Sequence, residues 1–128
     1  MSHKAERPLS PHLQVYKPQL TSVMSILHRM AGAALAVGTV MIVWLLLAAA
    51  SGEAAYNQFI WVCNTIMRKL ALFGWSAALF YHLCNGVRHL FWDTGRLFEI
   101  KNAYRAGYVV LAVTVLMVVV FWRKVSGF

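Results

Sequence analysis

Three long runs without a charged residue dominate this sequence of 128 residues. They cover Met30–Ala50, Leu70–Val87 and Ala106–Trp122, which have 21, 18 and 17 residues. A helix needs about 20 predominantly apolar residues to cross the hydrocarbon core of a bilayer, within a range of about 17–25. The three runs therefore predict three membrane-spanning helices.

The composition supports a membrane protein. Hydrophobic residues make up 60% of the chain and charged residues 12%, whereas soluble domains are about half apolar and about a quarter charged. A soluble chain of this length cannot bury so much apolar surface. We expect an all-α integral membrane protein that forms a single membrane-anchor domain over residues 1–128. Residues 1–21 should be an extended cytoplasmic segment, and the spans should lie at about residues 22–50, 66–91 and 104–124.

Lysine and arginine are distributed unevenly between the two ends of these spans. Eight of them precede the first span or lie between the second and third: Lys4, Arg7, Lys17, Arg29, Arg88, Arg96, Lys101 and Arg105. Four lie at the opposite ends: Arg68, Lys69, Arg123 and Lys124. Since positive residues favour the cytoplasmic side, we expect the N-terminus in the cytoplasm, or in the matrix of a mitochondrion. The net charge is +8, but the positive residues stand singly or in pairs. This pattern favours membrane anchoring over nucleic-acid binding.

The ends of the helices have their own signals. The hydroxyls of Thr21 and Ser22 suit an N-cap for the first helix, and Ser51-Gly52 should end it. Residues 54–67 should form an outer turn or interfacial helix, and residues 93–104 a short inner connection.

His82 is the histidine that we expect deepest in the membrane. Arg88 follows six residues later, which is ~9 Å along a helix, and marks the inner end of the second span. Gly74, Ala78 and Gly86 share a helix face with His82. A flat face with one projecting imidazole suits a haem with an axial nitrogen. The same spacing fits a helix-packing seam of small residues or a proton relay, and all three interpretations stay open.

Ser25 and Arg29 are four residues apart in the first span and share one helix face. A hydroxyl and a guanidinium at this place can bind a carbonyl oxygen that gains negative charge on reduction, because arginine offers five donors. They can also bind a haem propionate or a lipid phosphate. An arginine that extends its charge to the membrane surface explains the pattern without any ligand.

His89 and Asp93 have the same spacing at the inner end of the second span. A histidine paired with a carboxylate can pass protons, although a solvated helix end explains the pair equally well. We expect His28 and His89 at the interface, which leaves His82 as the only histidine at its depth. Neither Cys63 nor Cys84 belongs to a CxxC or CxxCH motif, so we expect no cysteine-ligated metal and no covalently attached haem.

Three segments resemble those of a known family. Arg7–Tyr16 and Thr21–Arg29 look like the entry signature of the cytochrome b subunit of succinate dehydrogenase, the larger membrane anchor of complex II. His82–Gly95 matches that family's second signature, H-x-x-x-G-V-R-H-x-x-W-D-x-G. The resemblance covers essentially the whole chain and is greatest to the alphaproteobacterial and mitochondrial branch.

The resemblance implies a four-subunit succinate:quinone oxidoreductase in a bacterial or mitochondrial inner membrane. A flavoprotein subunit oxidises succinate, an iron–sulfur subunit carries the electrons, and two small anchor subunits bind ubiquinone and haem b. The isolated chain is then expected to have no succinate-oxidising activity. The basic inner face would dock the iron–sulfur subunit, and lipid would surround the spans. A non-redox structural or transport subunit with three spans is the alternative interpretation.

The resemblance also assigns roles to single residues. His82 would be one axial ligand of the haem iron, and a histidine of the second anchor would be the other. His28 and Arg29 would lie near the haem propionates, while Ser25 and Arg29 would help to form the quinone pocket. The family commonly has Ser or Thr two residues after the His-Arg pair, where this chain has Ala31.

Overall fold

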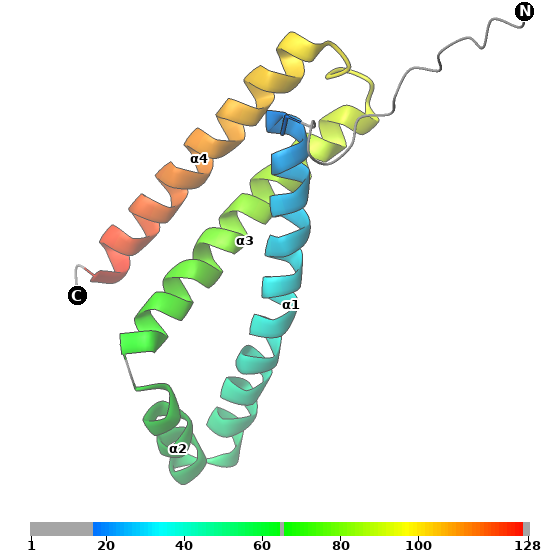
Figure 1. Ribbon diagram of the computed structural model, residues 1–128. Coiled ribbons are helices and arrows are strands. Elements are labelled where there is room, and N and C mark those ends of the chain that lie inside the picture. Colours follow the sequence, from blue (N-terminus) through cyan, green and yellow to red (C-terminus); the bar gives the residue numbers. More distant parts are fainter. Residues whose placement is uncertain (1–16, 65, 127–128) are drawn as a thin grey trace, which may run out of the picture.

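The computed structural model describes residues 17–64 and 66–126, and it consists of helices joined by short connections (Figure 1). The four helices are α1 (Leu20–Ser51), α2 (Glu53–Cys63), α3 (Ile66–Asp93) and α4 (Ile100–Ser126). Of these, α1, α4 and the stretch Arg68–Asp93 of α3 are long and apolar enough to cross a membrane. The expected all-α protein with three spans is confirmed.

The three long helices contain the expected spans and extend beyond them by up to four residues. The largest difference is at the start of α4, which begins four residues before the expected position 104. The inner connection therefore shrinks to residues 94–99. The expected outer helix is present as α2, within residues 53–63. Most of the expected extended segment 1–21 lies outside the described residues.

The start of α1 differs from the expectation. Gln19, not Thr21 or Ser22, precedes the first helical residue, and its side chain makes no capping bond. Its backbone carbonyl accepts the amide of Val23 at 3.0 Å. The helix therefore begins before the expected cap, and the hydroxyls of Thr21 and Ser22 lie inside its first turn. The end of α1 is as expected. Gly52 follows Ser51 with φ 109°, a backbone conformation that residues other than glycine rarely adopt.

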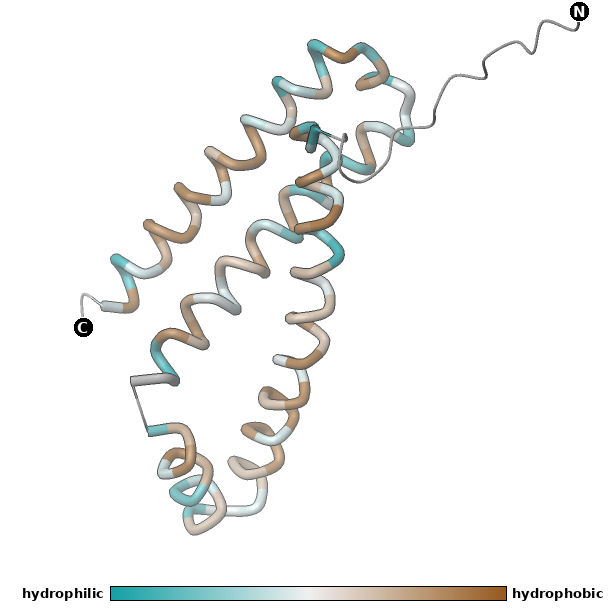
Figure 2. The backbone as a smooth tube through the Cα atoms, in the orientation of Figure 1, coloured by the Kyte–Doolittle hydropathy of each residue, from teal (hydrophilic) through white to brown (hydrophobic). Residues whose placement is uncertain are grey.

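The three long helices run up and down beside one another, with α3 between α1 and α4 (Figure 1). The start of α1, the end of α3 and the start of α4 gather at one end of the molecule. The short helix α2 folds back along the other end of α1, where the rings of Trp44 and Phe59 meet at 4.9 Å. Figure 2 shows hydrophobic residues along the middle of the helices and most hydrophilic residues towards their ends. This distribution suits a bilayer.

The buried core is small and lies in the half of the molecule where α1 starts. It consists of Met24, Ala31, Tyr81 and Val110, and the Tyr81 hydroxyl donates to the carbonyl of Met24 at 2.7 Å. Most other large hydrophobic side chains are exposed. Apolar faces of this kind are covered in a membrane by lipid or by helices of another subunit.

One glycine allows α1 and α3 to approach closely on the far side of this core. A Cβ atom at Gly38 would overlap the indole ring of Trp75. With the indole of Trp75 in this position, only glycine fits at position 38.

Candidate functional site

The crossing of α1 and α3 brings three histidines together. The rings of His28 and His82 are stacked, with centroids 3.9 Å apart and planes 7° apart. His89 meets the edge of His28 at 5.0 Å. The expectation that His82 is the only histidine at its depth is therefore wrong. The two helices are antiparallel, so a residue near the start of α1 lies level with one in the second half of α3.

One hydrogen bond orients the ring of His82. Its Nδ1 lies 3.2 Å from the backbone carbonyl oxygen of His28. A carbonyl only accepts, so Nδ1 is the donor in this bond, and Nε2 is the nitrogen that can offer a lone pair to a ligand. Metal-binding histidines are commonly oriented in this way by a second, outer hydrogen bond. On α1, a Cβ at Gly32 would lie 3.1 Å from Cε1 of His82. The ring is thus held against a glycine as well as against His28.

The small residues in register with His82 divide into two groups. Ala78 packs against the core, as the helix-packing interpretation predicts. A Cβ at Gly74 or Gly86 would meet no atom within 4 Å, so space is open beside these two glycines. A planar ligand has room beside Gly86, one turn from His82, but not over Ala78.

His28 and His82 cannot lie on opposite sides of one haem in this arrangement. Their stacked rings at 3.9 Å are in contact, whereas an axial pair needs the macrocycle between them. No group of three or more His, Cys, Asp or Glu within residues 17–64 and 66–126 is arranged to hold a metal ion.

The sequence places Arg88 at the inner end of the second span but does not reveal its burial. Only 3% of its surface is exposed. Its guanidinium donates to Asn85 Oδ1 at 3.2 Å and to the carbonyl of Ala103 on α4 at 3.4 Å, and it lies 4.1 Å from the ring centre of Trp92. No carboxylate pairs with it among the described residues. The three-residue spacing of Asn85 and Arg88 was the available signal.

His89 bonds to a different partner from the expected one. Its Nε2 lies 3.4 Å from Nδ2 of Asn85, one turn earlier in α3. The carboxylate of Asp93 is exposed and has no hydrogen-bond or ion-pair partner in the part of the chain that the structure describes. The predicted pair of His89 and Asp93 does not form here.

Ser25 and Arg29 lie on one face of α1, as expected. Ser25 is half-buried and Arg29 is exposed. Neither side chain has a hydrogen-bond partner within the described ranges, so the hydroxyl and the guanidinium are both available to a ligand. His28 lies beside them in sequence, and its buried Nδ1 also lacks a partner in the same ranges.

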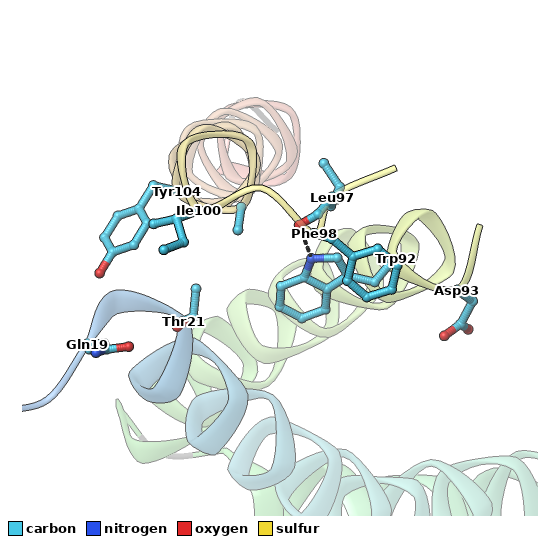
Figure 3. A pocket seen from close by; sticks show the side chains of 9 residues that line it. Gln19, Thr21, Trp92, Asp93, Leu97, Phe98, Ile100 and Tyr104 are labelled. Carbon is cyan, nitrogen blue, oxygen red and sulfur yellow. Dashed lines mark hydrogen bonds between the residues drawn. The ribbon is translucent and has the colours of Figure 1, made fainter. Parts of the chain in front are cut away.

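An open pocket of about 670 Å³ lies at the end of the molecule where α1 and α4 start. Figure 3 shows Trp92 on one side of it, with its indole nitrogen donating to the carbonyl of Leu97 at 3.0 Å. Asp93 lies at its edge (Figure 3). Ser25, Arg29 and His82 do not line this pocket. It is therefore separate from the predicted ligand residues, although it adjoins the end of α3.

Comparison with known proteins gives one consistent result. Residues 3–121 match the family described as succinate dehydrogenase/fumarate reductase transmembrane subunit. The succinate dehydrogenase cytochrome b556 subunit of Rickettsia conorii is 43% identical over 117 residues, which is 91% of each chain. That of Paracoccus denitrificans is 43% identical over 122 residues, covering 91% of this chain and 94% of the relative. The cytochrome b560 subunit of Marchantia polymorpha is 41% identical over 117 residues, covering 84% and 82%.

Proposed function

The chain belongs to the succinate dehydrogenase/fumarate reductase transmembrane subunit family, and we propose that it is the haem b-binding anchor at which ubiquinone is reduced. Members of this family are multi-pass subunits of an inner-membrane enzyme complex, and the three spans agree with that location. The relatives are named cytochrome b subunits, which favours a redox role over a purely structural or transport one.

We assign Nε2 of His82 as an axial ligand of the haem iron. The observation that carries this assignment is the bond from Nδ1 of His82 to the carbonyl of His28, at 3.2 Å. It leaves the other nitrogen free and oriented. The open space beside Gly86 supports the same assignment. The bound haem would supply a one-electron redox centre inside the membrane. A histidine of a second small anchor subunit would be the other axial ligand.

His28 and Arg29 are suited to the carboxylates of the haem propionates. Arg29 is an exposed cation at the start of α1, and Nδ1 of His28 is a buried polar atom without a partner among the described residues. Hydrogen bonds between an arginine and a carboxylate are among the stronger ones in proteins. The propionates would satisfy both groups.

Ser25 and Arg29 would bind the carbonyl oxygen of ubiquinone. Reduction of a quinone consumes two electrons and two protons, so the site should lie where a low-dielectric pocket meets water. The two donors lie in the first turns of α1, near the end of the span. We assign proton supply to His89 and Asp93, which lie at the same end on α3. Because no hydrogen bond joins these two side chains, they would act independently.

The remaining surfaces would contact other subunits and lipid. Four exposed cations surround the end where α1 and α4 start: Lys17, Arg96, Lys101 and Arg105. We assign this face to the cytoplasm or matrix, where it would dock the iron–sulfur subunit that connects to the flavoprotein. The exposed apolar faces of the spans would be covered by the second anchor and by lipid.

A visible spectrum of the assembled complex tests this function. We expect the purified complex to show reduced-minus-oxidised bands of b-type haem after addition of succinate or a chemical reductant. The control is the flavoprotein and iron–sulfur pair without the anchors, which should oxidise succinate with a soluble acceptor but show no such bands. A complete complex that reduces ubiquinone without any haem signal would contradict the haem assignment.

A further inference from the structure

A buried amide on α3 connects a fixed positive charge to a histidine. Asn85 has no exposed surface. Arg88 and His89 follow it by three and four residues, so both lie on the same face of the helix. The amide has one oxygen that accepts and one nitrogen that donates two hydrogens, and it bonds to both neighbours.

The charge of Arg88 decides which way this amide points. A guanidinium has only donors, so the acceptor Oδ1 of Asn85 must face it, and the two atoms lie 3.2 Å apart. The amide nitrogen then faces Nε2 of His89 at 3.4 Å. The opposite orientation would place two donors against each other in a buried position.

The amide in turn decides where His89 carries its proton. An amide nitrogen cannot accept a hydrogen bond, so Nε2 of His89 must accept and cannot hold a hydrogen. We propose that Asn85 and Arg88 are positioning residues that hold His89 as a neutral ring with its proton on Nδ1. Protonation of Nε2 would require the amide to move away.

The surroundings keep this arrangement in place. Arg88 is also held by the carbonyl of Ala103 from α4, at 3.4 Å, and by the ring of Trp92, at 4.1 Å. The titratable group that faces His89 from α1 is His28, at 5.0 Å between ring centres. Among the described residues no carboxylate bonds to His89 or to Arg88. No other described side chain therefore competes with Asn85 for a hydrogen bond to Nε2 of His89.

This arrangement limits how His89 can take part in quinone reduction. Here the inference rests on the proposed function, in which His89 supplies protons at the inner end. With Nε2 occupied by Asn85, the Nδ1–H group can donate a hydrogen bond to the quinone side. Release of that proton requires Nε2 to take up another one, and therefore requires the amide of Asn85 to move away. A variant that frees or protonates Nε2 should change the pH dependence of quinone reduction.

Nitrogen magnetic resonance of the assembled complex with ¹⁵N-labelled histidine tests the inference. The His89 signals are identified by their loss in His89→Gln. We expect wild-type His89 to be protonated at Nδ1 and unprotonated at Nε2. In Asn85→Asp the side chain offers only acceptors, so Nε2 should become protonated. The matched control is Asn102→Asp on α4, which introduces the same change beside Glu99 and should leave the His89 signals unchanged.

The outcomes separate the inference from the proposed function. A proton on Nε2 in the wild-type complex overturns the inference, even if the Asn85→Asp variant does not assemble. Equal spectra for Asn85→Asp and the wild type also overturn it. If the proton moves but the pH profile of quinone reduction does not, the tautomer assignment stands and the role of His89 in proton supply is refuted.

Discussion

His82 is oriented by α1, although it belongs to α3. The carbonyl of His28 holds its Nδ1 at 3.2 Å, and Gly32 leaves room for its ring. Ala31, where the family commonly has a hydroxyl, is buried between these two positions. The residues that determine the reactivity of His82 thus lie on another helix, and a change there should alter the imidazole without touching it.

The donors Ser25 and Arg29 should matter for the quinone and not for succinate. A hydrogen bond to a charged group contributes roughly 1.5–3 kcal/mol, which corresponds to about a 10–100-fold effect. We expect Arg29→Ala and Ser25→Ala to lower quinone reduction in this range, while succinate oxidation with a soluble acceptor persists. Thr39→Ala is the control, because its hydroxyl bonds to its own helix. A parallel fall of both activities would mean a failure of assembly and not a quinone site.

The exposed carboxylate of Asp93 should have a smaller effect than the ring of His89. Asp93→Asn keeps the shape of the side chain and removes no hydrogen bond or ion pair within the described residues. Haem content should therefore stay normal, and quinone reduction should fall only modestly. His89→Gln removes a ring that contacts His28 and Trp92, and it should slow quinone reduction more. The measurement is the rate of quinone reduction by the two variants and the wild type across pH 6–9. A larger loss in Asp93→Asn would refute this order.

At the scale of helices, the crossing of α1 and α3 determines the site. It depends on two glycines of α1. The indole of Trp75 lies over Gly38, and the ring of His82 lies against Gly32. Both contacts lie on the same pair of helices, so a shift of the crossing would separate His28 from His82.

Gly38→Ala should therefore destabilise the complex and loosen the haem site. The added methyl overlaps Trp75, and overpacking of this kind typically costs about 1–3 kcal/mol. We expect a lower melting temperature of the purified complex and earlier release of haem on heating. The control is Thr39→Ala, the next residue of α1, whose hydroxyl bonds to the carbonyl of Leu35 in its own helix. Equal melting curves for Gly38→Ala and the wild type would show that the crossing does not depend on this contact.

The sequence was sufficient to predict the helices but not their register. The bounds predicted for the three spans agree with the ends of the helices to within four residues, because a membrane requires a continuous apolar helix. The stacking of His28 on His82 and the burial of Arg88 depend on how antiparallel helices align, and residue spacing within one helix does not encode that. The cap at Thr21 or Ser22 was missed because the carbonyl of Gln19 already starts the helix.

At the scale of the whole molecule, the two ends of the bundle carry different charge. The end with the start of α1 and residues 94–99 has most of the lysines and arginines, and α2 lies at the other end (Figure 1). Because positive residues favour the cytoplasmic side, we expect the first end to face the cytoplasm or matrix. We propose that a second anchor subunit and lipid cover the exposed apolar faces between the ends.

Labelling of single cysteines measures this orientation. In a background of Cys63→Ser and Cys84→Ser, we expect Asn57→Cys on α2 to react with a membrane-impermeant maleimide added to the outer side. Arg96→Cys, in the inner connection, should react only when the inner side is exposed and the iron–sulfur subunit has been released. Both positions are exposed, so accessibility within the chain does not distinguish them. The reverse pattern would contradict the assigned topology.

The central claim is that His82, and not the neighbouring His28, binds the haem iron together with a histidine from another subunit. The most direct measurement is the electron paramagnetic resonance spectrum of the oxidised haem in two variants, His82→Leu and His28→Leu. We expect the low-spin signal of a bis-histidine haem to be lost in His82→Leu and retained in His28→Leu, with its position at most shifted. A low-spin signal that persists in His82→Leu, or is lost only in His28→Leu, would contradict the account.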